Sequence, residues 1–152
     1  MSEKPIMIAE AGVNHNGDVN RAIDLVHAAR DVGAGIVQFQ ASCSADIVAD
    51  SAPTAEYQTA KTAKVTQTDL LGELELSQDD MTKVAEACQK AGIEFLCTPF
   101  DTNWLSKLIN LGVKRLKAGS GDLTNLPLLG SFSKTGLPII LSTGMGNLEE
   151  VG

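Results

Sequence analysis

The chain has 152 residues, 43% of them hydrophobic, which suffices for one domain with a substantial core and excludes a disordered chain. Its 19 acidic and 12 basic residues give a net charge of -7, which disfavours nucleic acid and anionic membrane surfaces as partners. We find neither a signal-peptide pattern nor the roughly 20 apolar residues of a membrane span, so we expect a cytoplasmic protein. Three cysteines without metal-ligand spacing, Cys43, Cys88 and Cys97, favour reduced thiols.

Short apolar runs alternate along the chain with segments whose apolar residues repeat at helical spacing. The predicted strands are residues 5–10, 35–40, 93–100, 113–121 and 137–145. The predicted helices run from Asp18 to Gly33, from Ser77 to Gly92, from Asp101 to Gly112, and through residues 126–136. A capping residue precedes each of the first three helices and a glycine ends each of them, which supports these boundaries.

Strands separated by helical crossovers predict an α/β fold with a parallel sheet. A (β/α)8 barrel takes about 250 residues, and five strands cannot close one. The pattern therefore leaves two architectures open, a five-stranded open α/β domain or the first five βα units of a barrel. Residues 41–76 form a polar excursion that is too long for a passive connection, so we expect that segment to be functional or partly helical.

Polar residues collect at the carboxyl ends of the five predicted strands. They are Glu10, Gln38, Gln40, Thr98, Lys117, Ser120, Ser142 and Thr143. In parallel α/β folds these ends form the rim where ligands bind, and the rim gathers residues that are far apart in sequence. Burying such groups without partners costs about 1–3 kcal/mol each, which favours contacts with a ligand, with water or within a network.

Lys117 admits three interpretations. It can pair with a nearby carboxylate or extend into solvent; it can hold a phosphate or carboxylate; or it can form a Schiff base with a carbonyl substrate. The glycines of the segment AGSGD, Gly119 and Gly121, allow an anion to approach the backbone N–H groups closely. The anion-binding interpretation fits these glycines best.

Two carboxylates, Glu10 and Asp122, are the candidates for orienting a hydroxyl or moving a proton at the rim. Asp122 has a strong alternative as a helix cap, because it lies just before the predicted helix at 126–136. His15, in the segment NHNG, is interpreted as part of a plain turn in which the backbone satisfies the ring. Trp104, Leu105, Leu108 and Ile109 are expected in the core.

Taken together, these segments resemble the sialic acid synthase family. The resemblance runs in order over nearly the whole chain, through IAEAGVNHNGD, GAGIVQFQ, GIEFLCTPFD, LKAGSGDLTNLPLL and KTGLPIILSTGMGNLEE. It implies condensation of phosphoenolpyruvate with an N-acetylated amino sugar, N-acetylmannosamine or a diacetamido relative, to give a nonulosonic acid and phosphate. It also implies a (β/α)8 barrel followed by an antifreeze-like domain, a homodimer, and a manganese or magnesium ion that activates the sugar aldehyde.

The resemblance assigns roles to individual residues. It implies that Lys117 and Ser120 hold phosphoenolpyruvate and that Ser142 contacts its phosphate. It implies proton handling near the metal for Asp122 and contact with the acceptor sugar for Glu10. The residues that match the family's strand-two glutamine and its rim threonine are Gln40 and Thr98.

The chain departs from the family pattern in two places. The family's strand-two motif reads Val-Lys-Phe-Gln, with a lysine that contributes to phosphoenolpyruvate binding, but position 38 here is Gln38. A neutral amide still hydrogen-bonds a carboxylate, yet charge-assisted bonds are about twice as strong, so we expect weaker donor binding. The family's metal-binding histidines lie on later strands, and the histidines here are His15 and His27, so we expect no metal ligand in this chain.

We therefore expect residues 1–152 to be the N-terminal part of a synthase barrel domain, with the later strands and the antifreeze-like domain outside the chain. On this interpretation the 152-residue chain is inactive by itself. Two alternatives stay open: a non-catalytic binding module derived from the barrel, and a Schiff-base aldolase that uses Lys117.

Overall fold

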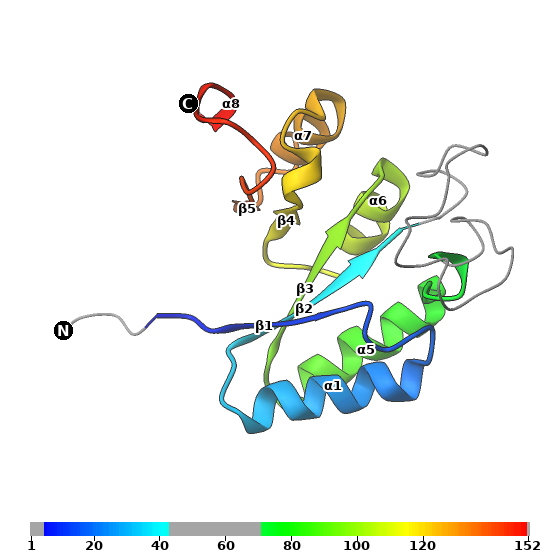
Figure 1. The fold of residues 1–152 in the computed structure, drawn as a ribbon. Helices are drawn as coiled ribbons and strands as arrows, with labels where there is room; N and C mark the ends of the chain where they lie inside the picture. The colour runs from blue at the N-terminus through cyan, green and yellow to red at the C-terminus, as the bar shows by residue number, and fades with distance from the viewer. Residues whose placement is uncertain (1–4, 43–70, 152) are drawn as a thin grey trace, which may run out of the picture.

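The computed structural model describes residues 5–42 and 71–151, in which strands and helices alternate (Figure 1). The elements are β1 (Ile8–Gly12), α1 (Val19–Asp31), β2 (Ile36–Ala41), α5 (Gln78–Ala91), β3 (Glu94–Pro99), α6 (Thr102–Asn110), β4 (Leu116–Ala118), η1 (Ser120–Asp122), α7 (Leu126–Ser133), β5 (Ile139–Leu141) and α8 (Leu148–Val151). The predicted α/β alternation is confirmed. The expectation for residues 41–76, like that for Cys43, falls largely outside the described residues.

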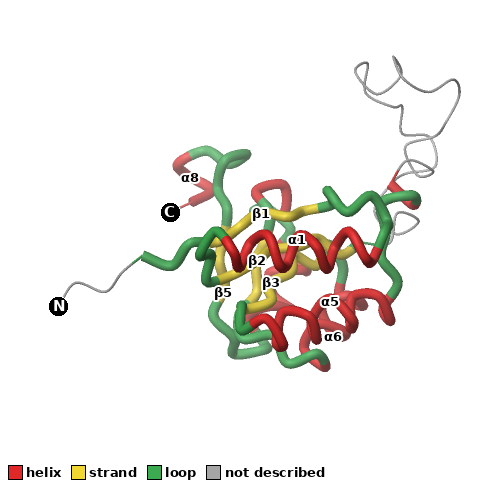
Figure 2. Tube along the Cα trace, turned by 90° about the horizontal axis from the view of Figure 1, so that it is seen from below, coloured by secondary structure: helices red, strands yellow, loops and turns green. Residues whose placement is uncertain are grey.

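All strand pairings in the described residues are parallel, as predicted. β1, β2 and β3 form one sheet in that order, and β4 pairs with β5 in a second. In the first sheet Gln38 lies between Glu10 of β1 and Leu96 of β3, and Gln40 lies beside Thr98. Helices α1 and α5 pack side by side over one face of this sheet (Figures 1 and 2). The sheets therefore set the polar residues of neighbouring strands next to one another at one end.

All five strands differ in extent from the prediction, β2 and β3 by only one residue at each end. β1 begins at Ile8 instead of residue 5 and runs to Gly12, whereas β4 and β5 have three residues each. β4 ends early because the backbone turns at once: the Asp122 N–H donates to the Gly119 carbonyl, which starts the 3-10 helix η1. The predicted long fourth strand is therefore a short strand followed by a turn that carries the polar residues.

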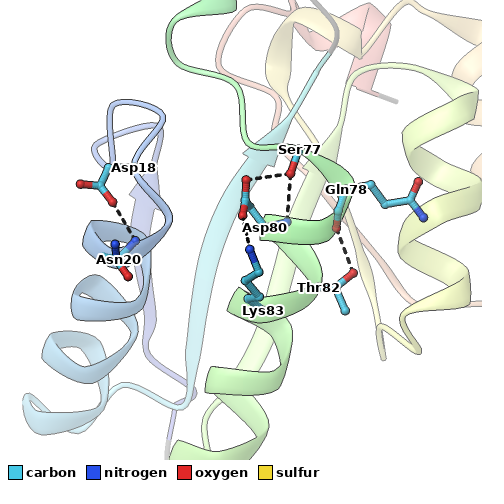
Figure 3. A network of polar contacts seen from close by, with 7 residues as sticks. All are labelled: Asp18, Asn20, Ser77, Gln78, Asp80, Thr82 and Lys83. Carbon is cyan, nitrogen blue, oxygen red and sulfur yellow. Dashed lines mark hydrogen bonds and ion pairs between the residues drawn. The ribbon is translucent and has the colours of Figure 1, made fainter.

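Side-chain caps fix the starts of α1 and α5, as predicted. Figure 3 shows Asp18 accepting from the backbone of Asn20, and Ser77 accepting from the backbone N–H of Asp80. The Asp80 carboxylate also accepts from Lys83 Nζ at 2.7 Å, and this contact, with the Ser77 hydroxyl, lowers the pKa of Asp80. In a βα unit the helix starts where the strand has ended, so these caps lie toward the carboxyl ends of the strands.

The core lies between the sheets and the helices, and it includes Trp104, Leu105 and Leu108 of α6 as expected. Ile109, also expected there, is 41% exposed, so that prediction is wrong. At 100° per residue Ile109 lies about 90° from the centre of the buried stripe of α6, at its edge. Cys88 and Cys97 are buried free thiols, and no helix in the described ranges is long and apolar enough to cross a membrane.

Candidate functional site

Hydrogen bonds join four of the predicted site residues, one from each of the first four strands. Lys117 Nζ donates to Glu10 Oε2 at 3.2 Å and to Gln38 Oε1 at 2.9 Å. Gln38 Nε2 in turn donates to Thr98 Oγ1 at 3.0 Å and to the carbonyl oxygen of Phe39 at 2.7 Å. Residues separated by up to 107 positions thus form one polar network, as the rim argument predicted.

The Lys117 ammonium is at the centre of this network. It donates to a carboxylate and to an amide oxygen, and an ammonium has three hydrogens, so a third remains for another acceptor. The Lys117 side chain is 22% exposed and that of Glu10 is 52% exposed, so the ion pair is open to solvent on the Glu10 side. The pairing with a carboxylate, which was one of the three interpretations of Lys117, is therefore present in a form that leaves the cation accessible to an anion.

Gln38 is fully buried and Thr98 is nearly so, with exposures of 0% and 2%. The orientation of the Gln38 amide is fixed by its neighbours, because the Lys117 ammonium can only donate and the Phe39 carbonyl can only accept. Both hydrogens of the Gln38 amide are consequently used inside the protein.

Gly12 brings Glu10 and Gln40 together beside the network. β1 has an irregularity between Glu10 and Gly12, where Gly12 adopts a left-handed φ of 55°. A Cβ at Gly12 would lie 3.3 Å from Glu10 Oε1 and 3.6 Å from Gln40 Nε2. A glycine is therefore suited to this position, and it leaves room for the Glu10 carboxylate that reaches Lys117.

The GSGD segment carries Ser120 and Asp122 in η1. The interpretation of Asp122 as a cap is wrong, because Asn125 caps α7 by accepting from the Leu128 N–H at 3.3 Å. Asn125 also donates its side-chain N–H to Asp122 Oδ1 at 3.1 Å, which orients the carboxylate. The sequence held a signal for this cap, since asparagine followed two residues later by Pro127 is typical of a helix start.

The turn after β5 lies against the GSGD segment. The Ser142 N–H donates to the Ala118 carbonyl at 3.1 Å and continues the pairing of β5 with β4. A Cβ at Gly121 would lie 3.8 Å from Met145 Sδ, so the two turns are in contact. In the described part of the chain the hydroxyls of Ser120 and Ser142 have no protein partner. These hydroxyls are available to a ligand.

His15 belongs to a turn, as predicted. Its Nδ1 accepts from the Gly17 N–H at 3.1 Å, and its buried ring lies 6.1 Å from the Phe39 ring, centre to centre. Burial lowers the pKa of His15, which keeps the ring neutral. Its Nε2 is buried without a partner among residues 5–42 and 71–151. His15 is therefore not part of the Lys117 network.

Comparison with known proteins identifies the family of this chain. Residues 25–152 match the NeuB family. The chain belongs to that family. It is 46% identical over 146 residues to the N,N'-diacetyllegionaminic acid synthase of Legionella pneumophila, covering 95% of this chain and 41% of that one. It is 42% identical over 150 residues to the synthase of the same name from Campylobacter jejuni, with 98% and 45% covered.

A solved structure of the NeuB type agrees with the fold. N-acetylneuraminic acid synthetase from Leptospira borgpetersenii superposes with a TM-score of 0.81 at 34% identity, over 97% of this chain and 48% of that one. The resemblance to the sialic acid synthases and the barrel fold are thereby confirmed. The chain spans less than half the length of the curated relatives that it matches.

The described residues of this NeuB family member do not make a metal site on their own. Among them no three His, Cys, Asp or Glu side chains cluster as ligands would. Burial raises the pKa of Cys88 to about 12, so its thiol stays protonated and is a poor ligand.

Sequence reasoning missed one charged pair beneath the site. Arg115 Nε and Nη2 donate to the two carboxylate oxygens of Glu94 at 2.6 and 3.1 Å, and the side chains are 29% and 15% exposed. Arg115 lies directly before β4, two residues ahead of Lys117. The sequence held no local signal for this pair, because Glu94 and Arg115 are 21 positions apart.

Proposed function

We propose that the chain is the N-terminal part of the barrel domain of a nonulosonic acid synthase, which condenses phosphoenolpyruvate with an N-acetylated amino sugar and releases phosphate. The observation that carries the proposal is the Lys117 ammonium, fixed at the strand ends by Glu10 and Gln38 and still open to an anion. Membership of the NeuB family supports it. The names of the two legionaminic acid synthases favour a diacetamido sugar over N-acetylmannosamine as the acceptor.

Phosphoenolpyruvate carries a carboxylate and a phosphate, so its site needs a cation and several neutral donors. Lys117 supplies the charge, because its third N–H is directed to no residue of the described chain. Ser120 and Ser142 supply hydroxyl donors from two turns that touch each other. We expect these three side chains to hold the donor substrate.

The two rim carboxylates have different surroundings and therefore different proposed roles. Asp122 is oriented by Asn125 and does not cap a helix, which suits a group that moves a proton. Glu10 is half exposed and lies beside Gln40 at Gly12, which suits contact with the hydroxyls of a sugar. We assign proton handling to Asp122 and acceptor binding to Glu10 and Gln40.

The rest of the machinery is proposed from the resemblance and from the length of the relatives. The later barrel strands, the antifreeze-like domain and the ligands of a manganese or magnesium ion would lie outside residues 1–152. We expect the 152-residue chain alone to be inactive, and the complete protein to be a cytoplasmic homodimer.

Phosphate release tests the proposal. The intact gene product is mixed with phosphoenolpyruvate, manganese, and either N-acetylmannosamine or 2,4-diacetamido-2,4,6-trideoxymannose, and phosphate is measured over time. We expect release that depends on the sugar and is faster with the diacetamido sugar. Absence of release with every such sugar would defeat the proposal.

The Schiff-base alternative has its own test. A Schiff base requires the lysine nitrogen to attack a carbonyl carbon, whereas hydrogen bonds to a carboxylate and to an amide oxygen hold the Lys117 nitrogen in place. Borohydride reduction in the presence of pyruvate should therefore leave Lys117 unlabelled. A pyruvyl adduct on Lys117 in the mass spectrum would favour the aldolase.

A further inference from the structure

Gln38 sits where a direct contact with substrate was expected, but its surroundings indicate a different role. It is completely buried, its oxygen accepts from Lys117 at 2.9 Å, and its two amide hydrogens go to the Phe39 carbonyl and the Thr98 hydroxyl. An amide that is fully used inside the protein has no hydrogen left for a ligand. Gln38 can therefore influence a ligand only through its neighbours.

We infer that Gln38 is a positioning residue that fixes the Lys117 ammonium and turns the Thr98 hydroxyl hydrogen toward the rim. Thr98 Oγ1 accepts from Gln38 Nε2 at 3.0 Å, so this side of the oxygen is occupied and its own hydrogen points elsewhere. Thr98 then acts toward a ligand as a donor, which selects an acceptor atom such as a carboxylate or phosphate oxygen.

The direction of the hydrogen bonds that link Lys117, Gln38 and Thr98 supports this assignment. From Lys117 to the Gln38 oxygen, and from the Gln38 nitrogen to Thr98, each group donates to the next in the same sense. Hydrogen bonds arranged head to tail polarise one another, and burial strengthens the effect. The positive charge of Lys117 therefore makes Thr98 a better donor, although no second cation is present at position 38.

Two substitutions separate the two effects of Gln38. Gln38→Met removes the acceptor for Lys117 and the donor to Thr98 at similar length. Gln38→Glu keeps an acceptor beside Lys117 but has no N–H, so Thr98 turns its hydrogen to the new carboxylate. A purely structural role would not distinguish these variants in this way.

The first measurement follows Lys117 without any activity. The intact gene product is trace-labelled with acetic anhydride, and acetylation of Lys117 is measured by mass spectrometry. Gln38→Met should raise the Lys117 rate about fivefold, the equivalent of one net hydrogen bond, and Gln38→Glu should not raise it. The matched control, Gln40→Met on the same strand, should leave that rate unchanged. An unchanged rate in Gln38→Met, or an equal rise in Gln40→Met, would overturn the assignment.

The second measurement concerns Thr98 and rests on the proposed function, since it uses phosphoenolpyruvate as the probe in calorimetry. Gln38→Met should weaken its binding about tenfold, and by clearly less when Thr98→Val is already present, because only the part of the loss that acts through Lys117 then remains. Full additivity with Thr98→Val would contradict the Thr98 part of the inference. If the wild-type protein binds no phosphoenolpyruvate, the proposed function fails, while the labelling result still decides the Lys117 part. Thermal melting of each variant confirms that it is folded.

Discussion

Arg115 and Lys117 are two residues apart at β4, and each forms an ion pair with a glutamate from another strand, but the two pairs differ in geometry. Arg115 makes two bonds to Glu94, of 2.6 and 3.1 Å, and the side chains are 29% and 15% exposed. Lys117 makes one bond of 3.2 Å to Glu10, which is half exposed. A planar bidentate pair is hard to replace, whereas a single ammonium contact can be exchanged for another anion.

This difference separates the two ends of the strands. Toward the amino end, the Arg115 pair joins the start of β3 to the residue that precedes β4. Toward the carboxyl end, the Lys117 pair is linked to Gln38 and Thr98 and lies near turns with open hydroxyls. We propose that the amino end contributes stability and that the carboxyl end binds the ligand, which is the division seen in barrel enzymes. The following predictions test that division.

The largest expected effect is at Asp122 on the carboxyl end. Asp122→Asn in the intact gene product should lower kcat for phosphate release about 100-fold, as loss of a general acid or base does, and should not weaken phosphoenolpyruvate binding. Its unfolding free energy should stay the same, whereas Asn125→Ala should lose about 1 kcal/mol because Asn125 is the cap. A destabilised Asp122→Asn with normal kcat would restore the cap interpretation.

The next effect is at Arg115 on the amino end. Arg115→Met leaves the Glu94 carboxylate mostly buried without its partner and should cost about 2 kcal/mol in urea unfolding. The double variant Arg115→Met with Glu94→Leu should regain most of that loss, because both charges are gone. Normal stability of Arg115→Met would show that this pair does not hold the strands together.

Two glycines in left-handed conformations, one near each end of the strands, allow the two ends to be compared directly. Gly17, in the turn after β1, has φ 74° and a Cβ there would meet the Glu73 carbonyl oxygen, whereas Gly33, before β2, has φ 83° and open space. Gly33→Ala should cost about 1 kcal/mol from backbone strain alone, and Gly17→Ala at least about 2 kcal/mol. Chemical denaturation measures both, and equal costs would mean that the turn after β1 yields easily.

The smallest effect is the pH dependence caused by His15. Burial holds the pKa of His15 in the folded protein below its ordinary value of 6.5. A proton therefore binds His15 more tightly in the unfolded chain than in the folded protein. The stability contributed by neutral His15 is present above pH 6.5 and lost as the pH falls through the folded-state pKa. His15→Asn should lose less stability than the wild type between pH 7.5 and 5.5, and exposed His27→Asn should behave like the wild type. Equal losses in the wild type and His15→Asn would contradict this account.

Much of the fold followed from local patterns, because helix caps and apolar periodicity depend on neighbours in sequence. The gathering of polar residues such as Lys117 and Glu10 at one rim also followed, since the carboxyl ends of parallel strands share one rim. The detailed partners did not follow: the buried amide of Gln38 bonds inward because of the tertiary positions of Thr98 and Lys117, which periodicity does not contain. The exposure of Ile109 and the lengths of β4 and β5 depended on tertiary packing for the same reason.

The central claim is that Lys117, held by Glu10 and Gln38, binds an anionic substrate. The most direct test is calorimetric titration of the intact gene product with phosphoenolpyruvate, for the wild type and for Lys117→Met. The account predicts saturable binding by the wild type and a loss of at least about tenfold in affinity for the variant, since a charge-assisted contact is removed. Equal affinity in the two proteins would contradict it.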